Sequence, residues 1–101
     1  MDSFNAEMDR KETIRRCRVL AHMLYQKDSI LSHERVAWDL RYFLASRYAD
    51  NEAVLSVIEF EAGIATYLSC GERAIKHALA VLLRLAWAFA DAPDYQEEWK
   101  P

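Results

Sequence analysis

Glycine and proline are scarce in this sequence, with only two of each among 101 residues. Tight hairpin turns, glycine-rich phosphate loops and disordered linkers depend on these residues, so their scarcity disfavours β-rich folds and nucleotide-binding loops. Apolar residues make up 52% of the chain and charged residues 29%. This composition, in a chain of the length of one domain, predicts an all-α protein with a single core.

Cysteine is equally rare, since Cys17 and Cys70 are the only two. The first residues, MDSFNAEMDRKE, lack the apolar segment of a secretory signal, so we expect a reduced, cytoplasmic protein. The most apolar stretch, residues 74–90, contains Lys76 and Arg84 and is shorter than a bilayer crossing requires. It therefore predicts a buried helix, and we expect no membrane contact.

An excess of positive charge is also missing, because the net charge is −3. The first 48 residues carry nine basic and seven acidic side chains, whereas residues 49–101 carry four basic and nine acidic ones. This balance disfavours binding to nucleic acids or anionic membranes through bulk electrostatic attraction. The acidic net charge therefore favours a protein as the binding partner.

Helix-breaking residues and apolar periodicity divide the chain into four helices. We expect these helices at about residues 5–27, 32–47, 51–68 and 72–90. Asp50 or Asn51 is the expected N-cap of the third helix. Ser69 and Glu72 have the spacing of a capping box before the fourth helix, and Gly71 alternatively closes the third helix in a left-handed conformation.

The fourth helix is apolar on nearly all sides, so we expect it at the centre of the core. Four antiparallel helices with short turns predict a compact four-helix bundle, or an orthogonal variant of it. Pro93 prevents the fourth helix from continuing. Residues 1–92 are therefore expected to form one helical domain and residues 93–101 a short C-terminal tail.

The sequence contains no recognisable pattern of catalytic or metal-binding residues. No glutamate stands three residues before a histidine, as in the helices of di-iron bundles, and neither glycine belongs to a nucleotide-binding motif. No serine or cysteine lies in a nucleophile motif. We therefore predict no catalytic residue, no cofactor and no metal, and an enzyme with a site assembled between helices is the third-ranked hypothesis.

The basic cluster from Arg15 to Arg18 suggests a different function, a dimeric nucleic-acid-associated regulator that uses the basic face of the first helix. Acidic residues precede Arg15 and Arg16 by one turn, however, as on a solvated helix face. The helix after Gly71 consists of core residues, where a DNA-recognition helix would carry polar ones. Nucleic-acid binding is therefore kept only as the alternative.

Two charged residues, Glu61 and Arg84, are placed at the margins of apolar helix faces. We expect a structural ion pair between them, formed by adjacent helices. The alternative is a buried polar group that specifies a dimer or a ligand contact.

Aromatic residues are numerous, with three Trp, five Tyr and four Phe. Four short helices cannot enclose all of them, so part of the apolar surface should remain for a protein partner or for a second copy of the chain. The partner-binding candidates are Trp38, Tyr42, Tyr95, Glu98 and Trp99. The alternative is that the tail packs its aromatic rings over its own bundle.

The final stretch, LRLAWAFADAPDYQEEWKP (residues 83–101), resembles the C-terminal signature of a family of small uncharacterised proteins from actinobacteria and their phages. Members of that family end in a leucine-rich helix followed by a phrase similar to YADHPDYREEWRP. The match includes Asp91, Pro93, Tyr95 and Trp99, whereas Ala92 stands at the usual histidine. The resemblance implies an actinobacterial or phage origin and an intracellular setting, and it brings no catalytic residues.

These features together predict a small non-catalytic helical protein that binds a protein partner. The specific version is a phage-encoded inhibitor or modulator of a host defence or regulatory protein.

Overall fold

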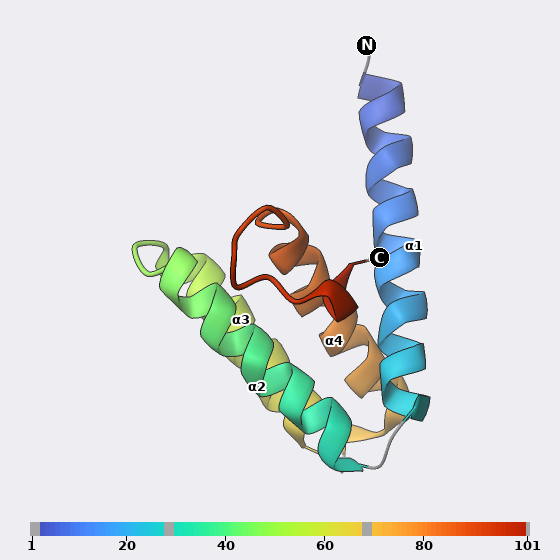
Figure 1. Cartoon of the computed structure of the whole chain (residues 1–101), viewed down its shortest axis with the longest axis vertical. Coiled ribbons are helices and arrows are strands. Elements are labelled where there is room, and N and C mark those ends of the chain that lie inside the picture. Colours follow the sequence, from blue (N-terminus) through green and yellow to red (C-terminus); the bar gives the residue numbers. More distant parts are fainter. Residues whose placement is uncertain (1–2, 28–29, 68–69, 101) are drawn as a thin grey trace.

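The computed structural model describes the backbone of residues 3–27, 30–67 and 70–100, and the side chains of residues 11–23, 33–67 and 70–100. Its helices are α1 (Ser3–Lys27), α2 (Ile30–Arg47), α3 (Glu52–Thr66) and α4 (Glu72–Trp87), followed by the short 3₁₀ helix η2 (Glu97–Trp99). No strand occurs within these backbone ranges. The predicted all-α four-helix bundle is confirmed (Figure 1).

The four helices alternate in direction along the chain (Figure 1). α2 and α3 run side by side, and α4 lies between α3 and α1. Because α4 packs against each of the other three helices, it is the central element that its apolar sequence predicts. The C-terminal segment crosses the space between α1 and α2, in front of α4 in Figure 1.

The core consists of apolar side chains from all four helices and from η2. α4 contributes the most, with Ile75, Ala78, Leu79, Ala80, Leu82, Leu83 and Ala86 buried. Alanines are frequent among the buried residues of the other helices as well, at positions 21, 37, 62 and 65. Such small side chains allow the helix axes to approach closely, which explains how short helices enclose a continuous core.

The turns around α3 confirm one prediction and correct another. Asn51 caps α3, as predicted, because its side-chain oxygen accepts a hydrogen bond from the backbone N–H of Val54 at 3.2 Å. α3 ends at Thr66, and Gly71 is the N-cap of α4 with a φ of 89°. Gly71 therefore starts the fourth helix and does not close the third one. Ser69, the first residue of the predicted capping box, lies outside the described residues.

The end of α4 also differs from the prediction, because the helix stops at Trp87 and not near Ala90. Successive turns follow, in which the N–H groups of Phe89, Ala92 and Tyr95 bond to carbonyls three residues earlier. Pro93 lies beyond this point, so it does not end the helix. Tertiary packing accounts for the early turn, because the Phe89 ring lies 5.5 Å from the Tyr48 ring of the α2–α3 corner.

Candidate functional site

Large apolar side chains of α2, of α3 and of the C-cap residue of α3 are exposed. We call this set the aromatic face, and it comprises Trp38, Tyr42, Val57, Phe60 and Tyr67. Tyr42, Phe60 and Tyr67 are the most open, with exposed fractions of 73%, 67% and 65%. Neighbouring apolar side chains of this size, left in water, are typical of a contact surface for another molecule.

Three members of the aromatic face, Val57 and Phe60 of α3 and its C-cap residue Tyr67, were not among the sequence-based candidates. The apolar residues of α3 recur at intervals of three and four positions along one side of the helix: Val57, Phe60, Ile64 and Tyr67. The opposite side holds the buried residues Ile58, Ala62 and Ala65. This second apolar stripe was visible in the sequence as a surplus of apolar residues, but only the packing shows which stripe the core leaves free.

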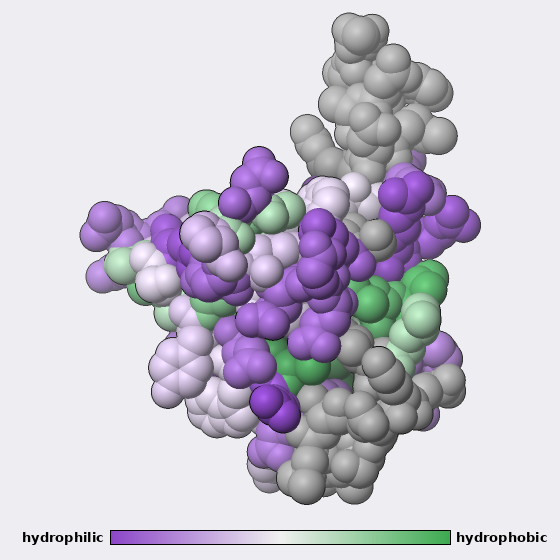
Figure 2. All heavy atoms as spheres, viewed as in Figure 1, coloured by the Kyte–Doolittle hydropathy of each residue, from purple (hydrophilic) through white to green (hydrophobic). Residues whose placement is uncertain are grey.

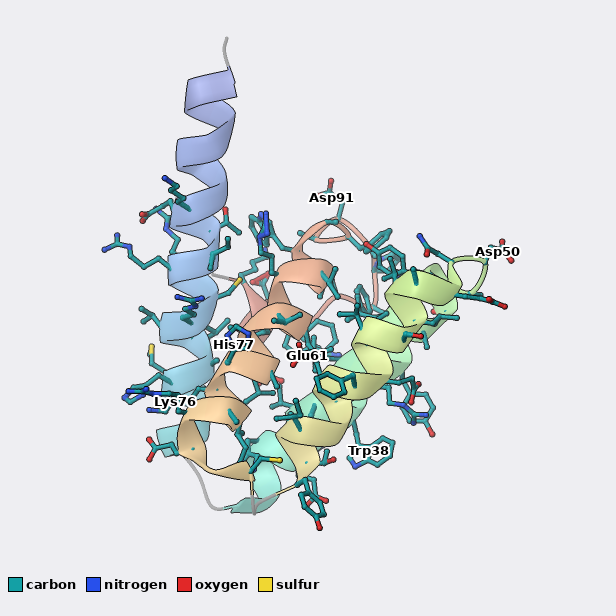
Figure 3. All side chains as sticks on the ribbon, turned by 180° about the vertical axis from the view of Figure 1, so that it is seen from behind. Trp38, Asp50, Glu61, Lys76, His77 and Asp91 are labelled. Carbon is teal, nitrogen blue, oxygen red and sulfur yellow. The ribbon has the colours of Figure 1, made fainter. Side chains whose placement is uncertain are left out.

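Trp38 is held in place at the junction of α2 and α3. The Arg41 guanidinium lies 5.0 Å from the centre of the Trp38 ring, and Arg41 Nε donates to both carboxylate oxygens of Glu59, at 2.9 and 3.0 Å. Trp38 and Gly63 line a depression of about 130 Å³, and a Cβ added at Gly63 would meet no atom within 4 Å. Figure 3 shows Trp38 projecting outward from this helix pair.

A second exposed apolar surface lies on α1. Val19 and Met23 are 55% and 59% exposed, and together with Leu20 and Lys100 they line a pocket of about 470 Å³. Figure 2 shows apolar side chains along α1 at the right of the molecule. No aromatic side chain is found among the described residues that line this pocket, and the charged residues Glu12, Arg15 and Arg16 also line it.

Trp99, a predicted partner-binding residue, lies in the core. Its exposed fraction is 2%, and its ring centroid lies 5.0 Å from that of Phe43 and 5.4 Å from that of Tyr95. Trp99 is therefore inaccessible to a partner, which corrects the sequence-based expectation for this residue. The buried position of Trp99 agrees with the alternative interpretation, in which the tail packs its aromatic rings over its own bundle. Glu98, by contrast, is exposed, and no ion pair to it is found within the described residues.

An ion pair connects the tail to α2. The side chain of Arg47, the last residue of α2, pairs with the Asp94 carboxylate and also donates to the Phe43 carbonyl at 2.9 Å. The same guanidinium lies 3.8 Å from the centre of the Phe43 ring. The Arg47 side chain is 21% exposed and that of Asp94 is 60% exposed, so water partly screens this pair.

Tyr95 is partly buried between the tail and the bundle. Its ring contacts those of Phe43 and Trp87 edge-on, with centroids 5.8 and 6.4 Å away. Its hydroxyl oxygen is buried and has no hydrogen-bond partner among the described residues. This burial raises the pKa of the Tyr95 hydroxyl to about 12.

We predict that Tyr95→Phe raises the free energy of unfolding by about 1 kcal/mol at pH 7, because it removes an unsatisfied buried hydroxyl and keeps the ring. Because the pKa of Tyr95 is near 12 in the folded chain and about 10 in the unfolded chain, its titration leaves the free energy of unfolding unchanged below about pH 10 and lowers it as the pH rises from 10 to 12. Urea titrations at pH 7 and pH 11 measure both effects. Tyr42→Phe is the matched control, because Tyr42 is 73% exposed. A loss of stability in Tyr95→Phe at pH 7 would contradict the prediction.

Glu61 and Arg84 do not form the expected ion pair. Both are described, yet no ion pair joins them, and Glu61 Oε1 and Arg84 Nε are buried atoms without a hydrogen-bond partner among the described residues. Figure 3 shows Glu61 between α3 and α4, whereas Arg84 lines a pocket of about 290 Å³ with Ile14 and Arg18 of α1. The two charged groups thus face different neighbours, which the helical pattern of each did not reveal.

In the basic cluster of α1, Arg15 and Arg16 lie on a solvent-exposed helix face, as the sequence indicates. The Glu12 carboxylate accepts hydrogen bonds from Arg15 at 2.9 Å and from Arg16 at 3.2 Å. These hydrogen bonds, that from Arg15 above all, hold the pKa of Glu12 below its ordinary value. Arg18 lies apart from this group and lines pockets between α1 and α4.

Both cysteines are free thiols, with Cys17 buried and Cys70 exposed. Burial raises the pKa of the Cys17 thiol. Among the residues with described side chains, no group of three or more His, Cys, Asp or Glu is arranged to hold a metal ion. None of the described helices combines the length and apolarity needed to cross a membrane.

No family model, curated protein or solved structure matches this chain. The resemblance of the C-terminal residues to actinobacterial and phage proteins therefore stays a prediction. In this fold the matching residues Asp94, Tyr95 and Trp99 hold the tail against α2 and the core.

Proposed function

We propose that this chain is a non-catalytic binding protein that engages a protein partner through the aromatic face. The observation that carries the proposal is the exposure of five large apolar side chains on the adjacent helices α2 and α3 and on the C-cap residue of α3. A protein core would normally cover such side chains, and their burial against a partner removes them from water.

Aromatic residues are suited to this role because they bury a large area and lose few rotamers on binding. Trp38 is already fixed by Arg41, which is itself held by Glu59. A side chain ordered before contact loses less conformational entropy when the complex forms. Trp38 is therefore the expected anchor, with Phe60 and Tyr67 supplying the broad apolar contact area.

The cytoplasm is the setting that we propose, because both cysteines are unpaired although one is exposed. The C-terminal resemblance supports a narrower proposal, a phage-encoded inhibitor or modulator of a host defence or regulatory protein. An inhibitor of this kind needs a stable scaffold and one binding surface. The helical bundle is the scaffold, and the aromatic face is the binding surface.

Site-specific crosslinking tests the proposal. A photoreactive phenylalanine analogue is placed at position 60 of the full chain, in cells that naturally express it. We expect one discrete crosslinked adduct, and Tyr67→Ser in the same chain should reduce its yield by about tenfold, as expected for a central contact residue. Light scattering of the purified chain shows whether the partner is a second copy.

The matched control carries the photoreactive residue at Asp91, which is exposed and lies outside the aromatic face (Figure 3). The same adducts from both positions, or none from position 60, would contradict a specific role for the aromatic face.

A further inference from the structure

A pocket lined by basic side chains lies between α1 and the first two turns of α4, on elements separate from the aromatic face. Its volume is about 750 Å³. The described residues that line it are Arg18 and His22 from α1, and Glu72, Arg73, Lys76 and His77 from α4. Figure 3 shows Lys76 and His77 on the side of α4 that is next to α1. Antiparallel packing thus gathers basic residues that are more than fifty positions apart in the sequence.

The charges of this pocket are only partly balanced. Glu72 is the one carboxylate among the lining residues whose side chains the structure describes, and it already pairs with Lys76 at 2.6 Å. Arg18 and Arg73 make no ion pair or hydrogen bond with any described residue. Such a concentration of positive charge stands out in a chain whose net charge is −3. The pocket is therefore electrostatically suited to an anion.

The backbone adds to this preference. The pocket borders the N-terminal end of α4, where the helix dipole is positive and the first N–H groups have no partner within the helix. The N-cap is Gly71, which has no side chain to accept from those N–H groups. Phosphate groups are commonly bound at helix N-termini for these reasons.

We infer that this pocket binds a small anion that carries two or more phosphate groups, and that it recognises the phosphates alone. The volume lies in the range of small-ligand sites. Two guanidinium groups, from Arg18 and Arg73, can each bind phosphate oxygens through two parallel N–H bonds. No Phe, Tyr or Trp is found among the described lining residues, which offer no indole, phenol or phenyl ring on which a nucleobase would stack.

Calorimetric titration of the full chain with sodium pyrophosphate tests the inference. We expect one site with a Kd of about 100 µM or tighter at about 50 mM salt. The double variant Arg18→Gln/Arg73→Gln should weaken binding by at least about tenfold, because it removes two charge-assisted contacts. Arg73→Lys, which keeps the charge and loses the paired N–H geometry, should weaken it by a smaller factor.

Arg35→Gln is the matched control, because Arg35 is exposed on α2, carries the same charge and lines no part of the pocket. It should change the Kd by less than about twofold. Circular dichroism of each variant confirms that the helices are intact, which is expected because Arg18 and Arg73 are exposed.

Comparison of ligands separates the possible sources of the phosphates. A nucleoside triphosphate should bind about as tightly as pyrophosphate, and inorganic phosphate more weakly. Equal affinity for inorganic phosphate would overturn the requirement for two phosphates, and much tighter binding of the nucleotide would overturn recognition through phosphates alone. Preferential binding of duplex DNA, or an equal loss of affinity in Arg35→Gln, would overturn the assignment of this pocket.

Discussion

Replacement of Trp99 by alanine should lower the free energy of unfolding by about 3–5 kcal/mol, the loss expected when a large buried aromatic side chain is removed from a core. Trp99 is 2% exposed and contacts the rings of Phe43 and Tyr95, so its removal would leave a cavity between the tail and α2. Urea unfolding followed by circular dichroism measures the change, and it avoids a fluorescence signal that the substitution itself alters.

Two further variants make this prediction specific. Trp38→Ala removes a tryptophan that is 43% exposed, and it should cost less than about 1 kcal/mol. Trp99→Phe should cost less than Trp99→Ala, because it retains a ring and because the buried Nε1 of Trp99 has no hydrogen-bond partner among the described residues. Equal losses for Trp99→Ala and Trp38→Ala would show that the tail is not part of the core.

Truncation of the chain after Ala92 should have a still larger effect. It removes Trp99, Tyr95 and the Asp94 carboxylate that pairs with Arg47. The summed loss is comparable with the total stability of a domain of this size, about 5–15 kcal/mol. We therefore expect a thermal midpoint lower by at least about 20 °C, or no cooperative transition, in a calorimetric scan.

Removal of residues 100–101 alone is the control, because it shortens the tail and leaves Trp99 in place. Lys100 is exposed, and its ion pair with Glu97 contributes little at the surface. This shorter deletion should lower the midpoint by only a few degrees. A chain truncated after Ala92 that unfolds cooperatively at the same temperature as the full chain would contradict a structural role for the tail.

The burial of Trp99 changes the interpretation of the tail. The residues that resemble the actinobacterial and phage signature contribute to packing here, since Asp94 pairs with Arg47 and Trp99 fills the core. Loss of partner binding on truncation would therefore report unfolding as readily as loss of a docking element. Substitutions at Phe60 and Tyr67, which are exposed, separate binding from stability more cleanly.

The sequence was most informative where structure depends on neighbours along the chain. The N-cap at Asn51 depends on one side chain and the backbone N–H three residues later. The central position of α4 follows from apolar residues on nearly all sides of that helix. The end of α4 was predicted too late, because the chain turns where Phe89 meets Tyr48, and no local signal reports that distant contact.

The sequence by itself determined the helical class, the number of helices and the surplus of aromatic residues, because periodicity and composition are local properties. Only the tertiary structure decided which of those aromatics are covered, since α3 has two apolar stripes and the tail had two possible positions. The tertiary structure also decided that Glu61 and Arg84 form no ion pair with each other. It likewise decided that Arg18 of α1 and Arg73 of α4 line one pocket. Contacts between helices depend on how the axes pack, and a helical pattern specifies faces without specifying the partner of each face.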